Sequence, residues 1–91
     1  MAEKFIQLKV ISKNGIKFHG DISSITMPSI SGEITLLPDH IPLLSGLKDG
    51  QIKVMDSTKS SHEIIIASGF IRFINNTCVV TIEEEKLQKA S

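Results

Sequence analysis

This 91-residue sequence has no tryptophan or tyrosine, one cysteine, and equal numbers of acidic and basic residues. Nucleic-acid binders usually carry excess basic charge and aromatic side chains that stack on bases, so we expect no nucleic-acid partner. Cys78 cannot form an internal disulfide, and its apolar neighbours indicate a buried thiol without a reactive role. No window approaches the roughly 20 apolar residues of a membrane-spanning helix, and the N-terminus lacks the apolar segment of a signal peptide. Any membrane connection would therefore run through a partner.

Motifs for catalysis and metal binding are also missing. The sequence has no phosphate-binding glycine loop, no cysteine pair, no His-Glu-x-x-His and no Gly-x-Ser-x-Gly. His19, His40 and His62 lie in three separate segments without the spacing of a metal site. We therefore expect a chain that is not an enzyme, with no catalytic residue, no metal and no cofactor. One alternative stays open: a small-molecule- or metal-binding β-barrel or jelly roll that uses the histidines, which would need a deep pocket with converging polar groups.

What the sequence does contain is a series of short alternating segments. Fifteen residues are isoleucine, whose β-branched side chain favours strands. Turn signals stand at Asn14-Gly15 and Asn75-Asn76, both typical of type I′ hairpins, and the polar run 56–61 indicates an exposed hairpin loop. A change of phase between Ile22 and Ile25 indicates a bulge near Gly20. The pattern predicts an all-β fold, a flattened antiparallel β-sandwich or barrel.

The stretch from Gly32 to Gly50 constrains the chain most. Pro38 and Pro42 exclude a single regular element there, because each removes a backbone donor and restricts the preceding residue. The stretch is too apolar for a solvated loop, so we expect a packed corner that presents Asp39 and His40. His40 itself either bonds backbone groups freed by the prolines or belongs to a partner surface. The apolar residues expected to pack are Ile34, Leu36, Leu37, Ile41, Leu43, Leu44 and Leu47.

The same corner carries a resemblance to a known family. Its order Gly-Glu, three residues, Leu-Pro, one residue, His, one residue, Pro-Leu-Leu resembles the N-terminal domain of the epsilon subunit of F-type ATP synthases. The likeness runs over roughly residues 5–83 and includes Phe-His-Gly at 18–20 and Ala-Ser-Gly-Phe at 67–70. It implies a flattened β-sandwich of about ten short strands, which we place over residues 1–83. For residues 84–91 the residues themselves, acids before lysines over only about two turns, predict a short helical or frayed tail. Full-length members continue into a two-helix hairpin, whereas this chain ends at Ser91, so no role of those helices is carried over.

The resemblance also implies a function. It suggests a non-catalytic central-stalk subunit of a proton-translocating F-type ATP synthase, which links the gamma subunit to the c-ring and couples rotation to ATP synthesis. Such a protein would be peripheral, on the cytoplasmic face of a bacterial plasma membrane or the stromal face of a thylakoid. The partner-binding residues implied are His40, Ser45 and Ser12 towards gamma, and Ser31, Gly32 and Glu33 towards the polar loops of the c-ring.

Three positions depart from the family pattern. Thr35 and Ser68 stand where the family often has glycine, and Asp39 stands at a variable position that is frequently glycine. A positive φ at Thr35 or Ser68 would strain a residue with a Cβ, so we expect the local bends to differ there.

Overall fold

The computed structural model describes residues 4–84, which form seven strands and no helix. The all-β prediction is confirmed, but the expected count of about ten strands is wrong, because two long strands run on where separate ones were expected. The last strand reaches Glu84, and the rest of the expected tail, residues 85–91, lies outside the described residues. The strands are β1 Ile6–Ser12, β2 Gly15–Ser29, β3 Gly32–Leu36, β4 Leu43–Leu47, β5 Gly50–Asp56, β6 Ser61–Ile74 and β7 Thr77–Glu84.

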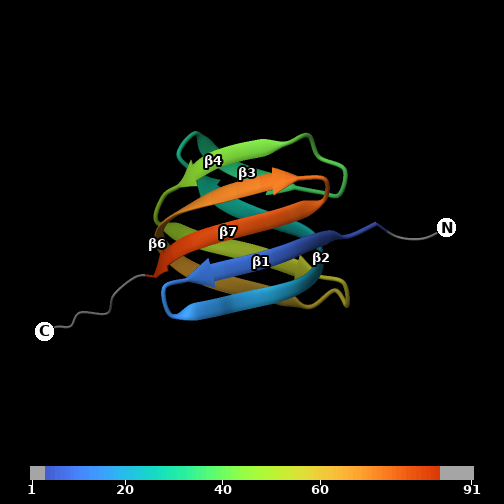
Figure 1. Ribbon diagram of the computed structural model, residues 1–91, viewed down its shortest axis with the longest axis horizontal. Helices are drawn as coiled ribbons and strands as arrows, with labels where there is room; N and C mark the ends of the chain where they lie inside the picture. Colours follow the sequence, from blue (N-terminus) through green and yellow to red (C-terminus); the bar gives the residue numbers. More distant parts are fainter. Residues whose placement is uncertain (1–3, 85–91) are drawn as a thin grey trace, which may run out of the picture.

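Five of the strands close on themselves through hydrogen-bonded pairs. The ring runs β1, β2, β5, β6, β7 and back to β1, while β3 adds to β2 and β4 adds to β6 (Figure 1). Neighbours are antiparallel except β1 and β7, which are parallel, so the sheet departs from the fully antiparallel arrangement that we expected. Closure leaves the ring without a free edge and gives a stiff body.

The two long strands, β2 and β6, stay continuous because bulges absorb the changes of phase. In β2 the register against β5 shifts between Ile22 and Ser24, so that Ile22 and Ile25 both point inward. The predicted phase change is thus confirmed, but it lies at Ser23 and not at Gly20. In β6 the register against β7 shifts between Ile66 and Ser68.

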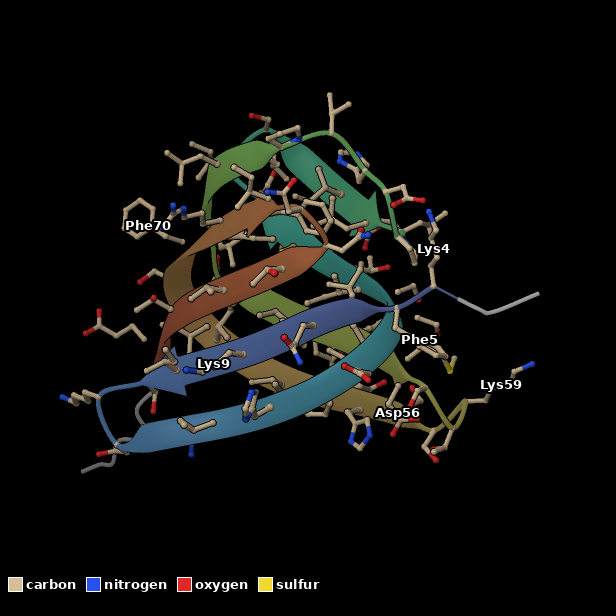
Figure 2. The ribbon with its side chains drawn as sticks, turned by 45° about the vertical axis from the view of Figure 1, so that its right-hand side comes forward. Lys4, Phe5, Lys9, Asp56, Lys59 and Phe70 are labelled. Carbon is tan, nitrogen blue, oxygen red and sulfur yellow. The ribbon has the colours of Figure 1, made fainter. Side chains whose placement is uncertain are left out.

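Of the three hairpin turns predicted from the sequence, two are found as predicted. Asn75 and Asn76 have φ of 51° and 57°, which confirms the predicted type I′ turn between β6 and β7. The loop between β5 and β6 is exposed as predicted, with Lys59 projecting outward (Figure 2). The Asp56 carboxylate accepts backbone N–H groups from Thr58 and Ser60. The first turn differs from its prediction, because Lys13 and Asn14 form the loop and the positive φ of 120° falls on Gly15.

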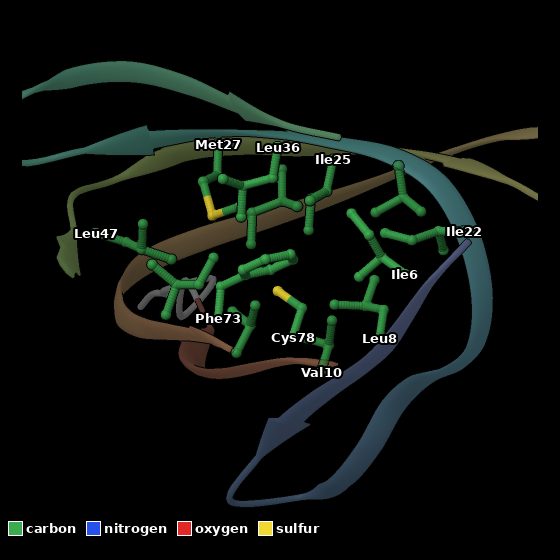
Figure 3. Close-up of a cluster of buried hydrophobic side chains, with 14 of the residues drawn as sticks. Ile6, Leu8, Val10, Ile22, Ile25, Met27, Leu36, Leu47, Phe73 and Cys78 are labelled. Carbon is green, nitrogen blue, oxygen red and sulfur yellow. The ribbon is translucent and has the colours of Figure 1, made fainter. Parts of the chain in front are cut away.

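The core fills the space between the sheet faces. Phe73 and Cys78 lie near its centre, surrounded by aliphatic side chains from β1, β2 and β3 (Figure 3). Burial raises the pKa of the Cys78 thiol to about 12, so the side chain acts as a small hydrophobic group. A filled interior of this kind leaves the outer surfaces as the places where the protein can meet a partner.

Candidate functional site

The proline-rich corner, residues 37–42, joins β3 to β4 and is tied to the β6–β7 turn by side-chain amides. The Asp39 backbone N–H donates to Asn76 Oδ1, and Asn76 Nδ2 donates to Asp39 Oδ1 over 2.9 Å. Lys4 Nζ lies 2.9 Å from Asp39 Oδ2. The Asn76 hydrogen bond, followed by that from Lys4, lowers the pKa of the Asp39 carboxyl below its usual range. The corner is therefore a fixed feature of the surface.

A positive φ, which we weighed for Thr35 and Ser68, is found at Asp39, at 70°. Thr35 and Ser68 instead lie within β3 and β6 and need no positive φ. Aspartate tolerates this conformation better than most residues, and the Asn76 amide holds it in place. The strain anticipated at Thr35 and Ser68 does not arise.

His40 is exposed on this corner with one side of its ring anchored. Its Nδ1 lies 2.8 Å from the Ile41 carbonyl oxygen, and the ring meets Phe73 edge-on at a centroid distance of 6.0 Å. The first of the two interpretations, a bond to backbone of the corner, is thus observed. The exposed side of the ring borders a shallow polar hollow of about 360 Å³ together with Asp39, Pro42, Asn75 and Asn76.

Ser45 lies further along β4 and is half-buried. It pairs with Ile71 of β6, and its hydroxyl donates to the Gly46 carbonyl oxygen over 3.0 Å. Its neighbours two residues away on the strand, Leu43 and Leu47, point towards the core, so Ser45 lies on that inward side. The residues of β4 that face outward are Leu44 and Gly46.

Ser12 lies at the opposite end of the sandwich from the corner. The Gln7 N–H donates to the Asn76 carbonyl oxygen, so the start of β1 is near the corner and Ser12 ends the strand about 16 Å away. Its hydroxyl accepts the Asn14 N–H over 3.1 Å and donates to the Gly15 carbonyl oxygen over 3.4 Å. The structure does not bring Ser12 to His40 and Ser45.

The same arrangement recurs in the β2–β3 turn. The Ser29 hydroxyl accepts the Ser31 N–H over 3.1 Å and donates to the Gly32 carbonyl oxygen over 2.5 Å. Ser12 and Ser29 are 6% and 1% exposed and are the buried polar residues within 4–83. Each belongs to a Ser-x-x-Gly unit whose glycine has φ near 120°. Because a buried hydroxyl must be paired, these serines shape their turns from inside.

Ser31, Gly32 and Glu33 form the exposed tip of that turn. The tip and the corner lie at opposite ends of β3, a separation of about 15 Å for a strand of five residues. The tip and the corner with His40 are therefore distant from each other, whereas Ser45 lies between them in the middle of β4 and Ser12 lies in the β1–β2 turn.

The expectation of a fully packed corner is wrong in part. Leu36 and Leu47 are buried, and Ile34 and Leu43 pack against the core. Three others face solvent: Leu37, Ile41 and Leu44, which are 56%, 73% and 76% exposed. Leu36-Leu37 and Leu43-Leu44 are doublets, so alternation turns one member of each outward.

The histidines do not converge among residues 4–83. His19 is exposed on β2, while His62 Nε2 lies 2.8 Å from Asp56 Oδ2 and its ring packs against Phe18. In the described part of the chain, no group of three His, Cys, Asp or Glu side chains is placed to hold a metal ion. That part also contains no helix long and apolar enough to cross a membrane.

Comparison with known proteins finds one consistent group. Residues 5–86 match the family model of the ATP synthase delta/epsilon chain beta-sandwich domain. The chain is 35% identical over 77 residues to the ATP synthase epsilon chain of Endomicrobium trichonymphae, covering 85% of this chain but 55% of that protein. It is 30% identical over 83 residues to the epsilon chain of Chlorobaculum tepidum, covering 91% of this chain and 94% of the relative.

Two solved structures share the fold at lower identity. One chain of the Euglena gracilis mitochondrial ATP synthase matches with a TM-score of 0.84 and 17% identity, over 92% of this chain and 54% of that one. A chain of the Tetrahymena thermophila mitochondrial ATP synthase, in a structure of its central stalk and c-ring, matches with a TM-score of 0.74 and 15% identity, over 92% of this chain and 67% of that one.

Proposed function

This chain belongs to the family of ATP synthase delta and epsilon chains that share a beta-sandwich domain, and on that premise we propose that it is a non-catalytic rotor subunit. In this proposal it links the gamma subunit to the c-ring of a proton-translocating F-type ATP synthase and couples proton-driven rotation to ATP synthesis. It would then be peripheral, on the cytoplasmic face of a bacterial plasma membrane or its stromal equivalent in a plastid.

The observation that carries the proposal is the separation of two exposed surfaces on one closed sheet. The corner with His40 lies at one end of β3, and the tip with Glu33 lies at the other. A coupling subunit must transmit torque between two partners without deforming, and closed strand pairing with a filled core resists deformation. The fold therefore supplies what a mechanical link requires.

Towards gamma we place His40 and Ser45. His40 offers an exposed ring whose orientation is set by Ile41 and Phe73, so little side-chain freedom would be lost on binding. Ser45 lies next to the exposed Leu44 on β4. Ser12 enters this proposal as the residue that shapes the β1–β2 turn, because its hydroxyl is already engaged there.

Towards the c-ring we place the tip, Ser31, Gly32 and Glu33. A carboxylate on a projecting turn suits a wet, polar contact with basic loop residues, where charge sets orientation and approach more than affinity.

The test of the gamma link is a pull-down with the gamma subunit of the same organism. The wild-type chain should retain gamma, and a His40→Asp, Ser45→Arg double variant should lose most of it, because the variant puts a negative charge into the corner and a bulky cation at a half-buried position of the neighbouring strand β4. The matched control is Ser61→Asp, Ser57→Arg, which makes the same charge changes at two exposed positions, one in the β5–β6 loop and one at the start of β6. Circular dichroism checks that all three chains are folded.

Retention of gamma by both variants would move the interface elsewhere on the sandwich. Failure of the wild-type chain to retain gamma at micromolar concentration would refute the proposed link.

A further inference from the structure

One outer face of the sheet carries exposed apolar side chains around two cations. Strand pairing lays its residues out in cross-strand rows over β4, β6, β7 and β1, which we call the β4–β1 face. The central row is Leu44, Arg72, Val79 and Lys9, and the next is Gly46, Phe70, Thr81 and Ile11.

The apolar part of this face is well exposed. Leu44 is 76% and Phe70 67% exposed, and both point away from the core, as Figure 2 shows for Phe70. Ile30, itself 70% exposed, lies beside them, because a Cβ at Gly46 would be 3.5 Å from its Cγ2 and 3.8 Å from Phe70 Cε1. Exposed apolar groups gathered in one place in this way mark an interaction surface more often than isolated ones do.

The charged side chains of the two central rows are both cations, and strand pairing places Glu83 of β7 one row beyond Thr81, opposite Ser68. Arg72 and Lys9 flank Val79, and the two central rows contain no acidic residue. Neither cation forms an ion pair with a carboxylate of residues 4–83. Arg72 also borders two surface hollows, one of about 310 Å³ that includes Pro42, Leu44 and Ile74, and one of about 290 Å³ on the side of Val79. An arginine side chain without an ion pair, set between two apolar hollows, is typical of a residue that anchors a protein interface. Such an anchor binds best to a carboxylate on the partner.

We propose that the β4–β1 face binds a segment of the gamma subunit that presents a carboxylate to Arg72 and apolar side chains to Leu44 and Phe70. The inference rests on the proposed function and extends its gamma contact. Pro42 and Leu44 connect this face directly to the corner that holds His40, so one partner can cover both without a gap.

Charge decides against a second copy of this chain as the occupant. A two-fold axis through the centre of the face would set Arg72 against its own symmetry mate, and no carboxylate of the two central rows is available to separate them. An acidic partner segment instead neutralises Arg72 and lies within reach of Lys9.

The test measures affinity for purified gamma by interferometry at about 50 mM and about 200 mM salt. Arg72→Glu should weaken binding at least about tenfold and reduce its salt dependence, because it replaces attraction by repulsion at a desolvated pair. Phe70→Ser should weaken binding without changing the salt dependence. Lys59→Glu makes the same charge reversal in the exposed β5–β6 loop and should stay within about twofold of wild type.

Each outcome assigns the face. Equal affinities for Arg72→Glu and Lys59→Glu, in chains shown to be folded by circular dichroism, would overturn this inference and leave the gamma link intact. A wild-type chain that does not bind gamma would overturn both. If sedimentation shows that the wild-type chain self-associates and that Phe70→Ser abolishes this, the face binds a second copy of the chain. If the wild-type chain binds anionic vesicles and Arg72→Glu abolishes this, the face binds a membrane surface. Either result would overturn gamma as the occupant.

Discussion

Replacing Ser29 by alanine should destabilise the domain more than replacing Ser12, although both hydroxyls make the same pair of hydrogen bonds in their turns. Each hydroxyl accepts one turn N–H and donates to one glycine carbonyl. At Ser29 the donated bond is 2.5 Å long, and at Ser12 it is 3.4 Å, beyond the usual range for O–H···O. Ser29 is also more deeply buried.

The magnitude follows from these bonds. A typical hydrogen bond contributes about 0.5–1.5 kcal/mol net, and a buried group left unpaired costs more. In the alanine variants the N–H of each exposed turn can reach water, so the loss comes mainly from the part-buried hydrogen bond to the glycine carbonyl. We therefore expect Ser29→Ala to cost about 1–2 kcal/mol and Ser12→Ala about 0.5–1 kcal/mol. For a domain of this size the larger loss lowers Tm by roughly 5–15 °C.

The assay is urea unfolding followed by far-ultraviolet circular dichroism, which suits a chain without tryptophan or tyrosine. The midpoint should fall by about 1 M for Ser29→Ala at an unchanged slope. Ser57→Ala, in the exposed β5–β6 loop, is the control and should stay within about 0.5 kcal/mol of wild type. A Ser29→Ala midpoint equal to that of the control would show that the hydroxyl does not hold the turn. Ser12→Ala should leave the gamma affinity of the folded protein unchanged, and a selective loss of affinity would make Ser12 a direct contact.

Two further predictions concern the core and acid stability. Phe73→Ala should lower the free energy of unfolding by about 3–5 kcal/mol, because the side chain is 1% exposed at the centre of the core. Phe70→Ala, at a residue that is 67% exposed, should lower it by less than about 1 kcal/mol. Urea midpoints compare the two variants, and equal losses would contradict the faces assigned to these residues. Hydrogen bonds to Asp56, first from His62 and then from Thr58, lower the pKa of its carboxyl below the unfolded value of about 3.9. Because the pKa of Asp56 is lower in the folded than in the unfolded chain, its carboxylate adds stability above pH ~4, and this stability is lost as the pH falls further. The urea midpoint of the wild-type chain should therefore drop below pH ~4, and that of Asp56→Asn should drop less. An unchanged drop would show that Asp56 is not responsible.

Much of the fold could be read from local chemistry. Alternation identified the strands, and asparagine in both central positions identified the Asn75-Asn76 turn, because that residue tolerates positive φ. The first turn was misread since Asn14-Gly15 matches a type I′ signal, yet the chain places Lys13 in the loop and uses Gly15 for the positive φ. A turn dipeptide such as Asn-Gly does not by itself determine which two residues form the loop and which residues of the two strands pair across it.

The partner residues show the same division. The sequence and its family resemblance predict partner surfaces at Glu33 of the tip and His40 of the corner, and both residues are exposed. Ser12 was grouped with them by resemblance, but the structure buries its hydroxyl in a turn at the other end of β1. Phe70 and Arg72 were missed, because an alternating strand does not reveal which of its faces another layer will cover.

The sequence by itself determined the all-β class, the alternating segments and the turns at 56–61 and Asn75-Asn76, because these depend on side chains and dihedral preferences a few residues apart. Only the tertiary structure decided that β2 and β6 run unbroken through bulges, that β1 and β7 pair in parallel, and which member of each leucine doublet faces the core. Those outcomes depend on register between segments distant in the chain. A shift of one residue exchanges the two faces of a strand, and only the assembled sheet selects among the registers.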